Sequence, residues 1–446
     1  MTDRPTQSPA VDSNAVAAED EVVQICQDLI RFDTSNYGDG AGPGERAAAE
    51  YTAGLLAEVG LEAEIFESAP GRASVVARIE GTDPGAGALV VHGHLDVVPA
   101  QKEDWSVDPF AAELKDGLVW GRGAVDMKDM DAMILSVVRE MQRTGTRPKR
   151  DLVIAMFADE EAGGAYGARW AVDNRPELFD GATEAISEVG GFSAQIGGKR
   201  AYLLQTAEKG LGWLSLKASG RAGHGSQVND DNAVTRLARA VARIGDYTWP
   251  IELTDTTRRF LDGVSELTGV EFDPDNPEIL LKELGTVARF VGATLQNTSN
   301  PTVLKAGYKD NVVPGAAEAR IDTRTLPGQD ELLLAKLKEL AGEGVEFSYV
   351  HHDVSLETPF EGPLVEAMVG ALEAEDPDAV VLPYTLSGGT DNKSLSRLGI
   401  TGYGFAPLQL PSDLDFPAMF HGVDERVPAE SLRFGARVLR RLLTTY

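Results

Sequence analysis

Short apolar runs alternate with helical stretches along much of the chain, and this alternation constrains the fold more than any other feature. Two such runs occupy residues 88–91 and 152–157, a further short strand is expected at 184–187, and helices are expected at 129–141 and 167–174. Strands that are apolar throughout, with helices between them, are typical of a mostly parallel sheet covered on both faces. The sequence therefore predicts an α/β fold for this part of the chain.

The middle of the chain shows a different pattern. Residues 213–218 and 317–322 alternate between apolar and polar side chains, which is typical of strands with one buried face. With a helix expected at 233–244, these strands predict an α+β domain inserted into the α/β domain. We expect a disordered segment at 1–18, the α/β catalytic domain at 19–205 and 329–446, and the insert at 206–328.

Charge and cysteine content restrict the function. The chain has 41 Lys and Arg against 70 Asp and Glu, a net charge of −29, which disfavours nucleic acids and membrane surfaces as partners. Cys26 is the single cysteine, so a disulfide within the chain is impossible and any metal site must use nitrogen and oxygen ligands. The polar first 20 residues do not resemble a signal peptide, and no apolar stretch approaches the roughly 20 residues of a membrane span. We therefore expect a cytoplasmic protein.

Histidines and acidic residues follow the predicted strands at the points where the strands end. Catalytic groups collect beyond the carboxyl ends of strands in open α/β sheets. Taken singly, Asp126 would also suit a helix N-cap, and paired acids would suit a solvated surface. Taken together, the residues indicate a metal site; in chain order they are His94, Asp96, Asp126, Glu160, Glu161, Glu188 and His421.

The same residues follow, in order, the pattern of the M20 family of metallo-amidohydrolases and peptidases. The chain resembles this family over nearly its whole length beyond Glu21, and the stretch Asp104–Phe110 and the turn Gly121-Arg122-Gly123 resemble it too. The family includes aminoacylase-1, carboxypeptidase G2, carboxypeptidase S and succinyl-diaminopimelate desuccinylase. The motifs that carry the resemblance are His94-x-Asp96, Asp126-x-Lys128, Glu160-Glu161, Glu188 and His421.

The resemblance implies two divalent metal ions, zinc in the first place and cobalt or manganese as alternatives. Asp126 would bridge the two ions. His94 and Glu188 would complete one site, and Glu161 and His421 would complete the other. Glu160 would act as the general base, and Asp96 would orient His94. A cis peptide bond is expected between Asp126 and Met127.

The resemblance also assigns the insert as a lid and dimerisation domain. His224 would polarise the scissile carbonyl, either in its own subunit or across a dimer. Asn311 would touch the substrate, and Arg324 would clamp a free carboxylate, unless it only forms a surface ion pair. A glycine-rich loop would supply Gly389 and Thr390 as further substrate contacts.

Three departures from the family pattern stand out. Asp129-Met130 replaces a small, glycine-rich pair, so Asp129 either adds a carboxylate near the metals or caps a helix. Gln227-Val228 stands where the lid motif usually has a proline, and the segment 247–301 is longer than in the smallest relatives. None of these departures removes a metal ligand or the base.

We therefore expect a two-metal hydrolase that cleaves the amide bond of a small N-acyl amino acid or peptide with a free carboxylate, by attack of a metal-bridging water. A dipeptidase, a carboxypeptidase and a desuccinylase are alternatives within the family, and a non-catalytic metal-binding relative is a further one. The expected partners are the small amide or peptide substrate and a second copy of the chain, without nucleic acid or membrane.

Overall fold

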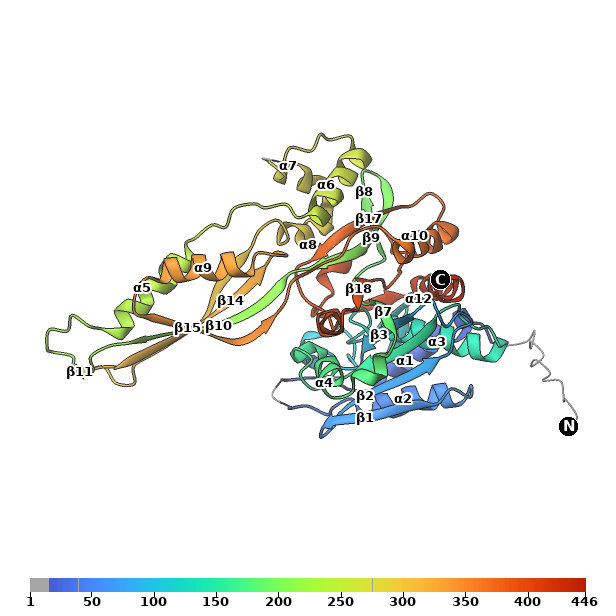
Figure 1. Cartoon of the computed structure of the whole chain (residues 1–446), viewed down its shortest axis with the longest axis horizontal. Helices are drawn as coiled ribbons and strands as arrows, with labels where there is room; N and C mark the ends of the chain where they lie inside the picture. The colour runs from blue at the N-terminus through green and yellow to red at the C-terminus, as the bar shows by residue number, and fades with distance from the viewer. Residues whose placement is uncertain (1–15, 39, 275) are drawn as a thin grey trace, which may run out of the picture. The chain divides into compact units, whose positions relative to one another are not determined.

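The computed structural model describes residues 16–38, 40–274 and 276–446 (Figure 1). The expected disordered lead-in, 1–18, therefore lies largely outside the described residues. The chain folds into two compact units, the first formed by residues up to 205, 360–382 and 390–446, and the second by 206–359 and 383–389. Within the described ranges, every helix is too short or too polar to cross a membrane.

The first unit is built on a large sheet whose strands follow the order β1-β2-β6-β3-β7-β18-β9. Its centre is parallel, since β3 pairs in parallel with β6 and β7, and β7 pairs in parallel with β18. The expected mostly parallel sheet is confirmed, and the antiparallel pair β1–β2 extends one edge. The strand bounds are β1 Ala63–Ala69, β2 Arg72–Ile79, β3 Ala88–His94, β6 Asp151–Phe157, β7 Ala182–Ser187, β9 Lys199–Glu208 and β18 Thr401–Gly404.

Helices cover both faces of this sheet. On one face, α1 (Ala18–Arg31), α3 (Lys128–Thr144) and α12 (Ala429–Thr445) pack against one another, and α3 contacts β3. On the other face, α4 (Ala168–Asn174) and α11 (Asn392–Leu395) join a core formed by alternate residues of β3 and β6. Burial on both faces explains why residues 88–91 of β3 and 152–157 of β6 are apolar throughout.

The second unit contains a four-stranded antiparallel sheet in the order β12-β14-β10-β15. Its strands are β12 Thr298–Ala306, β14 Ala316–Thr325, β10 Gly210–Ser219 and β15 Val345–Asp353. The helices α5 (Ala233–Gly245) and α9 (Asp330–Ala341) lie along the same side of this sheet (Figure 1), and their apolar faces form its core. One covered face explains the alternation seen in β10 and β14.

The main segment of the second unit ends at Pro359, not at Gly328 as expected. The difference arises because α9 packs against α5, and β15 pairs with β10 along 345–353, so both complete the antiparallel layer. The helical pattern of α9 carries no information about which domain it joins. β15 alternates between apolar and polar residues over 345–349, although as an edge strand it has no fully buried residue, and the expected boundary at Gly328 overlooked this signal.

Two pairs of short strands carry loops that are described below. The second unit also carries the two-residue strands β11 (Gly223–His224) and β13 (Val312–Val313), which pair with each other. In the first unit, β5 (Leu118–Trp120) pairs with β19 (Arg426–Pro428). Further elements are α2 Arg46–Ala57, α6 Asp255–Thr268, α7 Glu278–Leu281, α8 Ala288–Gly292, α10 Pro363–Glu375 and β17 Val380–Leu386.

Candidate metal centre

The predicted ligands lie on loops that leave one edge of the parallel sheet. His94 is the last residue of β3, Glu160 and Glu161 follow the end of β6, and Glu188 directly follows β7. Because these three strands are parallel neighbours, their carboxyl ends meet at the same edge. Asp126 comes from the turn before α3.

Asp126 lies between two histidines. Its Oδ1 is 3.2 Å from Nε2 of His94, and its Oδ2 is 3.2 Å from Nε2 of His421. The peptide bond between Asp126 and Met127 is cis, as expected. Met127 occupies the N-cap position of α3 without a capping side chain, so the Asp126 carboxylate faces the histidines and does not cap the helix.

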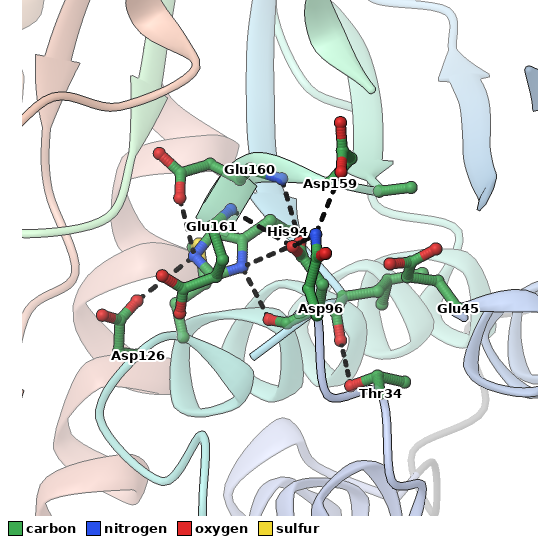
Figure 2. Close-up of polar contacts among 12 residues, drawn as sticks. Thr34, Glu45, His94, Asp96, Asp126, Asp159, Glu160 and Glu161 are labelled. Atoms are coloured by element: carbon green, nitrogen blue, oxygen red, sulfur yellow. Dashed lines mark hydrogen bonds and ion pairs between the residues drawn. The ribbon is translucent and has the colours of Figure 1, made fainter. Parts of the chain in front are cut away.

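The other acidic side chains divide between the two histidines. Oε2 of Glu188 is 3.5 Å from Nε2 of His94, and Oε2 of Glu160 is 3.9 Å from the same nitrogen. Oε2 of Glu161 is 3.1 Å from Nε2 of His421. Figure 2 shows the side chains of Asp126, Glu160 and Glu161 around the His94 imidazole. The structure thus brings all six of the predicted metal and base residues together.

Asp96 contacts His94 more closely through its main chain than through its carboxylate. Nδ1 of His94 is 2.9 Å from the backbone oxygen of Asp96, while the nearest carboxylate oxygen is 3.6 Å away. The carboxylate instead accepts the backbone N–H of Glu160 at 3.0 Å and that of Glu161 at 3.1 Å. Asp96 therefore orients the imidazole through its main chain and holds the Glu160-Glu161 backbone through its side chain.

Asn36 is a residue that the sequence reasoning missed. Its Nδ2 donates to Oδ2 of Asp96 at 2.9 Å and to Oδ1 of Asp159 at 3.0 Å. Its Oδ1 accepts a hydrogen bond from Nη2 of Arg72 at 2.9 Å, and Arg72 forms a buried ion pair with Glu45. Nothing in the residues around Asn36 marks it as part of the site, since its contacts span more than a hundred positions.

The carboxylates of the centre lie close together and are largely buried, whereas the His421 side chain is more exposed. Burial raises the pKa of Glu160 well above its usual value, and the charge of Glu188 adds to this effect. Burial also raises the pKa of Glu161, and it raises that of Glu188 to about 7. Hydrogen bonds to Asp126 and Glu161 raise the pKa of His421 to about 10.

For Asp126, burial acts to raise the pKa, but hydrogen bonds from His421 and His94 outweigh it and the pKa falls. A buried group of carboxylates that is short of positive charge favours a cation. Two sets of ligand atoms, each confined within 4.8 Å, could hold a metal ion: one from His94, Asp126 and Glu161, the other from His94, Glu160 and Glu188. Nitrogen and oxygen donors without thiolate suit zinc, cobalt or manganese.

Two neighbours in α3 are buried without joining these sets. Asp129 lies in the first turn of α3, and burial raises its pKa well above the usual value. Among the described residues, the candidate metal-ligand sets do not include it, and it is not the N-cap. Lys128 donates from Nζ to the backbone oxygen of Phe32 at 2.9 Å, and burial lowers its pKa to about 8.

The predicted residues of the second unit fall in separate places. His224 lies on β11, whose pairing with β13 brings it beside Asn311, and the N–H of Gly225 donates to the Asn311 oxygen at 2.8 Å. Nδ1 of His224 accepts a hydrogen bond from the backbone N–H of Ser226 at 3.3 Å and lies 2.8 Å from Oγ of the same serine. With Nδ1 as an acceptor, a neutral His224 carries its proton on Nε2, where it can be donated to a ligand.

Arg324 lies elsewhere, on β14. Its Nε donates to Oδ1 of Asp322 at 2.9 Å and its Nη2 to Oδ2 at 3.2 Å, so the ion pair considered from sequence is present. Gly389 is exposed in the loop after β17. Thr390 is buried, and its Oγ1 accepts the backbone N–H of Asn392 at 3.2 Å.

Comparison with known proteins places this geometry in context. A family model described as Peptidase family M20/M25/M40 matches residues 90–445. Aminoacylase-1 from Homo sapiens is 27% identical over 412 residues, which cover 90% of this chain and 90% of the relative. The M20 family metallo-carboxypeptidase Sso-CP2 from Sulfolobus solfataricus superimposes with a TM-score of 0.73 at 18% identity, covering 96% of this chain and 99% of the other. YxeP from Bacillus subtilis, a dinuclear metal binding peptidase, has a TM-score of 0.61 at 14% identity and coverage of 96% and 98%.

Proposed function

Because the chain belongs to peptidase family M20/M25/M40, whose members are metal-dependent amidohydrolases and peptidases, we propose that it hydrolyses the amide bond of a small N-acyl amino acid. The observation that carries this proposal is the position of Asp126 between His94 and His421, with Glu160 beside it. Similarity to human aminoacylase-1 over 90% of both chains favours a substrate in which an acyl group supplies the carbonyl of the scissile amide and an amino acid supplies its nitrogen.

We propose that two divalent ions, zinc by first choice, bind at this centre. His94 and Glu188 would hold one ion, His421 and Glu161 the other, and Asp126 would contribute one carboxylate oxygen to each. The separation of the two histidines by Asp126, with one acid close to each histidine, supports this division. Such ions, when bound, polarise the scissile carbonyl and lower the pKa of the attacking water.

Glu160 is the proposed general base. Its carboxylate would take a proton from the attacking water and deliver it to the leaving amine nitrogen. Two features support this role: Oε2 of Glu160 stands near His94 at 3.9 Å, farther than the proposed ligands, and its backbone is held by Asp96. A side chain whose backbone is fixed and whose carboxylate stands beside the proposed metal ligands suits proton transfer between two partners.

We propose that the second unit supplies the substrate contacts. Arg324 would hold the free carboxylate; its bonds to Asp322 engage Nε and Nη2, and the N–H groups of Nη1 point to no acceptor among the described residues. His224, with a proton on Nε2, would donate to the carbonyl oxygen, and Asn311 lies next to it. Gly389, the last residue of the second unit, and Thr390, where the first unit resumes, would border the substrate backbone. A second copy of the chain, docked through this unit, is the proposed source of His224.

A carboxypeptidase or dipeptidase activity is the second candidate. It is favoured by the structural similarity to the metallo-carboxypeptidase Sso-CP2 across 96% of this chain. The chemistry would be the same, because the two activities differ in the group on the acyl side of the amide. A desuccinylase activity would need a further acidic group on the acyl, and a non-catalytic role would be expected to accompany loss of a ligand or of the base.

The decisive experiment offers the enzyme a mixed pool of N-acyl amino acids and dipeptides and follows each compound by mass spectrometry. Metal-loaded and chelated protein are compared side by side. We expect chelator-sensitive loss of N-acyl amino acids. Loss of dipeptides alone would favour the second candidate, and no loss with protein of verified metal content would contradict both.

A further inference from the structure

Glu425 is a buried carboxylate that contacts the turn carrying Asp126. Its Oε1 accepts the backbone N–H groups of Val125 at 2.7 Å and of Asp126 at 3.2 Å. Its Oε2 accepts the backbone N–H of Gly123 at 3.0 Å and Nη1 of Arg122 at 2.6 Å. The side chain is 0% exposed, so all four bonds are made away from competing solvent.

Arg122 extends this contact to the loop that carries His421. While its Nη1 donates to Glu425, its Nη2 donates to the backbone oxygen of Gly422 at 2.8 Å. The guanidinium carbon lies 5.1 Å from the centre of the Trp105 ring, which packs over the buried pair. The Arg122–Glu425 pair therefore joins the turn 121–126 to the loop 421–425.

The loop 421–425 lies outside the helices and strands. Its other hydrogen bonds include those from the N–H of Ser106 to Oδ1 of Asp424 at 2.8 Å and from the N–H of Gly121 to the Glu425 backbone oxygen at 3.0 Å. His421 and Asp424 both have φ near +56°, in the left-handed region that is uncommon for residues other than glycine. The His421 side chain is 57% exposed, and the strand β19 begins only at Arg426. By contrast, His94 ends β3 and Glu188 directly follows β7, so the central sheet itself positions that half of the centre.

We propose that Arg122 and Glu425 are positioning residues for the half of the metal centre formed by His421, Glu161 and the shared Asp126. Neither residue belongs to the candidate ligand sets, so both would act through the backbones they hold. Glu161 has a separate support, since Asp96 accepts its N–H. This inference rests on the proposed two-metal function. When the pair is broken, the ion held by His421 and Glu161 should be lost first.

Glu425→Gln is the sharpest change, because glutamine keeps the shape and replaces one acceptor oxygen with an N–H donor. Whichever way the amide turns, one pair of donors faces another donor, and either Val125 and Asp126 or Arg122 and Gly123 lose their acceptor. Arg122→Lys is milder. Lysine keeps the positive charge but cannot reach Glu425 and Gly422 with a planar fork.

The experiment titrates metal-free protein with Co²⁺ and follows both the absorption spectrum and the number of ions bound. For wild-type protein we expect two ions per chain. For Glu425→Gln we expect the first ion to bind as in wild type and the second to bind roughly 10- to 100-fold more weakly, as changes around metal ligands typically cause. Arg122→Lys should give a smaller shift in the same direction.

A matched control breaks a similar pair at the opposite end of β7. Glu184 forms an ion pair with Arg150 near the start of that strand, and Glu184→Gln should leave both Co²⁺ affinities unchanged. Activity gives a second readout: excess metal should restore kcat in Glu425→Gln without altering KM. Circular dichroism of each variant identifies unfolded protein, and if Glu425→Gln is unfolded, Arg122→Lys alone decides.

The outcomes separate the two proposals. If wild-type protein binds two ions and both variants bind them with unchanged affinities, the positioning role is wrong while the two-metal centre stands. Equal weakening of both ions would also overturn the assignment to one half. If wild-type protein does not bind two ions per chain, the proposed function and the inference built on it both fail.

Discussion

Asp96 and Glu160 are joined by a hydrogen bond in which the backbone N–H of Glu160 donates to Oδ1 of Asp96 at 3.0 Å. Oδ2 accepts the N–H of Glu161 in the same way, at 3.1 Å. One buried carboxylate therefore sets the backbone of both the proposed base and a proposed metal ligand.

Asp96→Asn should lower metal affinity roughly 10- to 100-fold, because an amide group can accept only one of these two bonds. Metal retained after dialysis against graded chelator measures the change. Asp151→Asn is the matched control, since Asp151 also accepts a backbone N–H, that of Gly81 at 2.8 Å, but at the start of β6. Equal losses in both variants would contradict a specific role for Asp96.

Glu160→Gln should reduce kcat by at least about 100-fold, which is the usual contribution of a general base. Metal content should stay close to that of wild type, because Glu160 stands farther from His94 Nε2 than Glu188 does, 3.9 against 3.5 Å. Paired assays of turnover and bound metal test this. Turnover close to wild type would exclude Glu160 as the base, and loss of metal would make it a ligand.

His224→Ala protein should be inactive alone and regain part of its activity when mixed with inactive Glu160→Gln protein. The reason is that a hybrid dimer would contain one site with an intact Glu160 and an intact His224. Activity is measured after incubation under conditions in which differently tagged chains are seen to exchange. Exchange without recovery would place His224 and Glu160 of one site in the same chain.

Gly190→Ala should destabilise the protein by roughly 1–3 kcal/mol, the usual cost of an overpacked position. A Cβ on Gly190 would lie 1.9 Å from the backbone oxygen of Gly404, which cannot move aside as a side chain could. Thermal unfolding of the metal-free protein measures the effect. Gly54→Ala, in the exposed part of α2 with open space around it, should be neutral or stabilising.

Lys209 should make stability depend on pH. Burial lowers the pKa of its amine to about 7, with the charge of Arg324 adding to the effect, whereas the unfolded chain keeps a value near 10.5. Between these values the unfolded chain binds a proton that the folded chain has lost, so the free energy of unfolding rises with pH. Lys209→Met removes this contribution.

The stability of wild type relative to Lys209→Met should therefore increase from pH 7 to pH 10, as measured by the midpoint of thermal unfolding. The methionine retains most of the apolar stem of the lysine. The difference in stability between wild type and Lys209→Met at pH 7 therefore measures the contribution of the hydrogen bonds from Lys209 to the oxygens of Ala293 and Gln296. A difference that does not change with pH would mean that the buried amine stays charged.

The fold was predictable where burial leaves a periodic trace in the sequence. The runs 88–91 in β3 and 152–157 in β6 are apolar because both faces of these strands are covered, and β14 alternates because one face is covered. β15 also alternates over 345–349, but no strand was expected there, and this omission placed the domain boundary at Gly328.

The candidate site was predictable to the extent that strand ends and family motifs mark its residues. Asn36 and Glu425 escaped because each acts through hydrogen bonds to segments far away in the chain, about 300 positions in the case of Glu425 and Asp126. Asp96 was placed correctly beside His94, but its carboxylate bonds to backbone N–H groups, which no pattern of side chains can reveal.

The position of His421 along the chain has a consequence for synthesis. His94, Asp126 and Glu188 all precede the second unit, whereas His421 follows it. A ribosome therefore completes the ligands of one proposed ion more than two hundred residues before it supplies the last ligand of the other. The two ion sites are therefore completed in a fixed order during synthesis. The second ion can bind with its full set of ligands only after the inserted unit has been made.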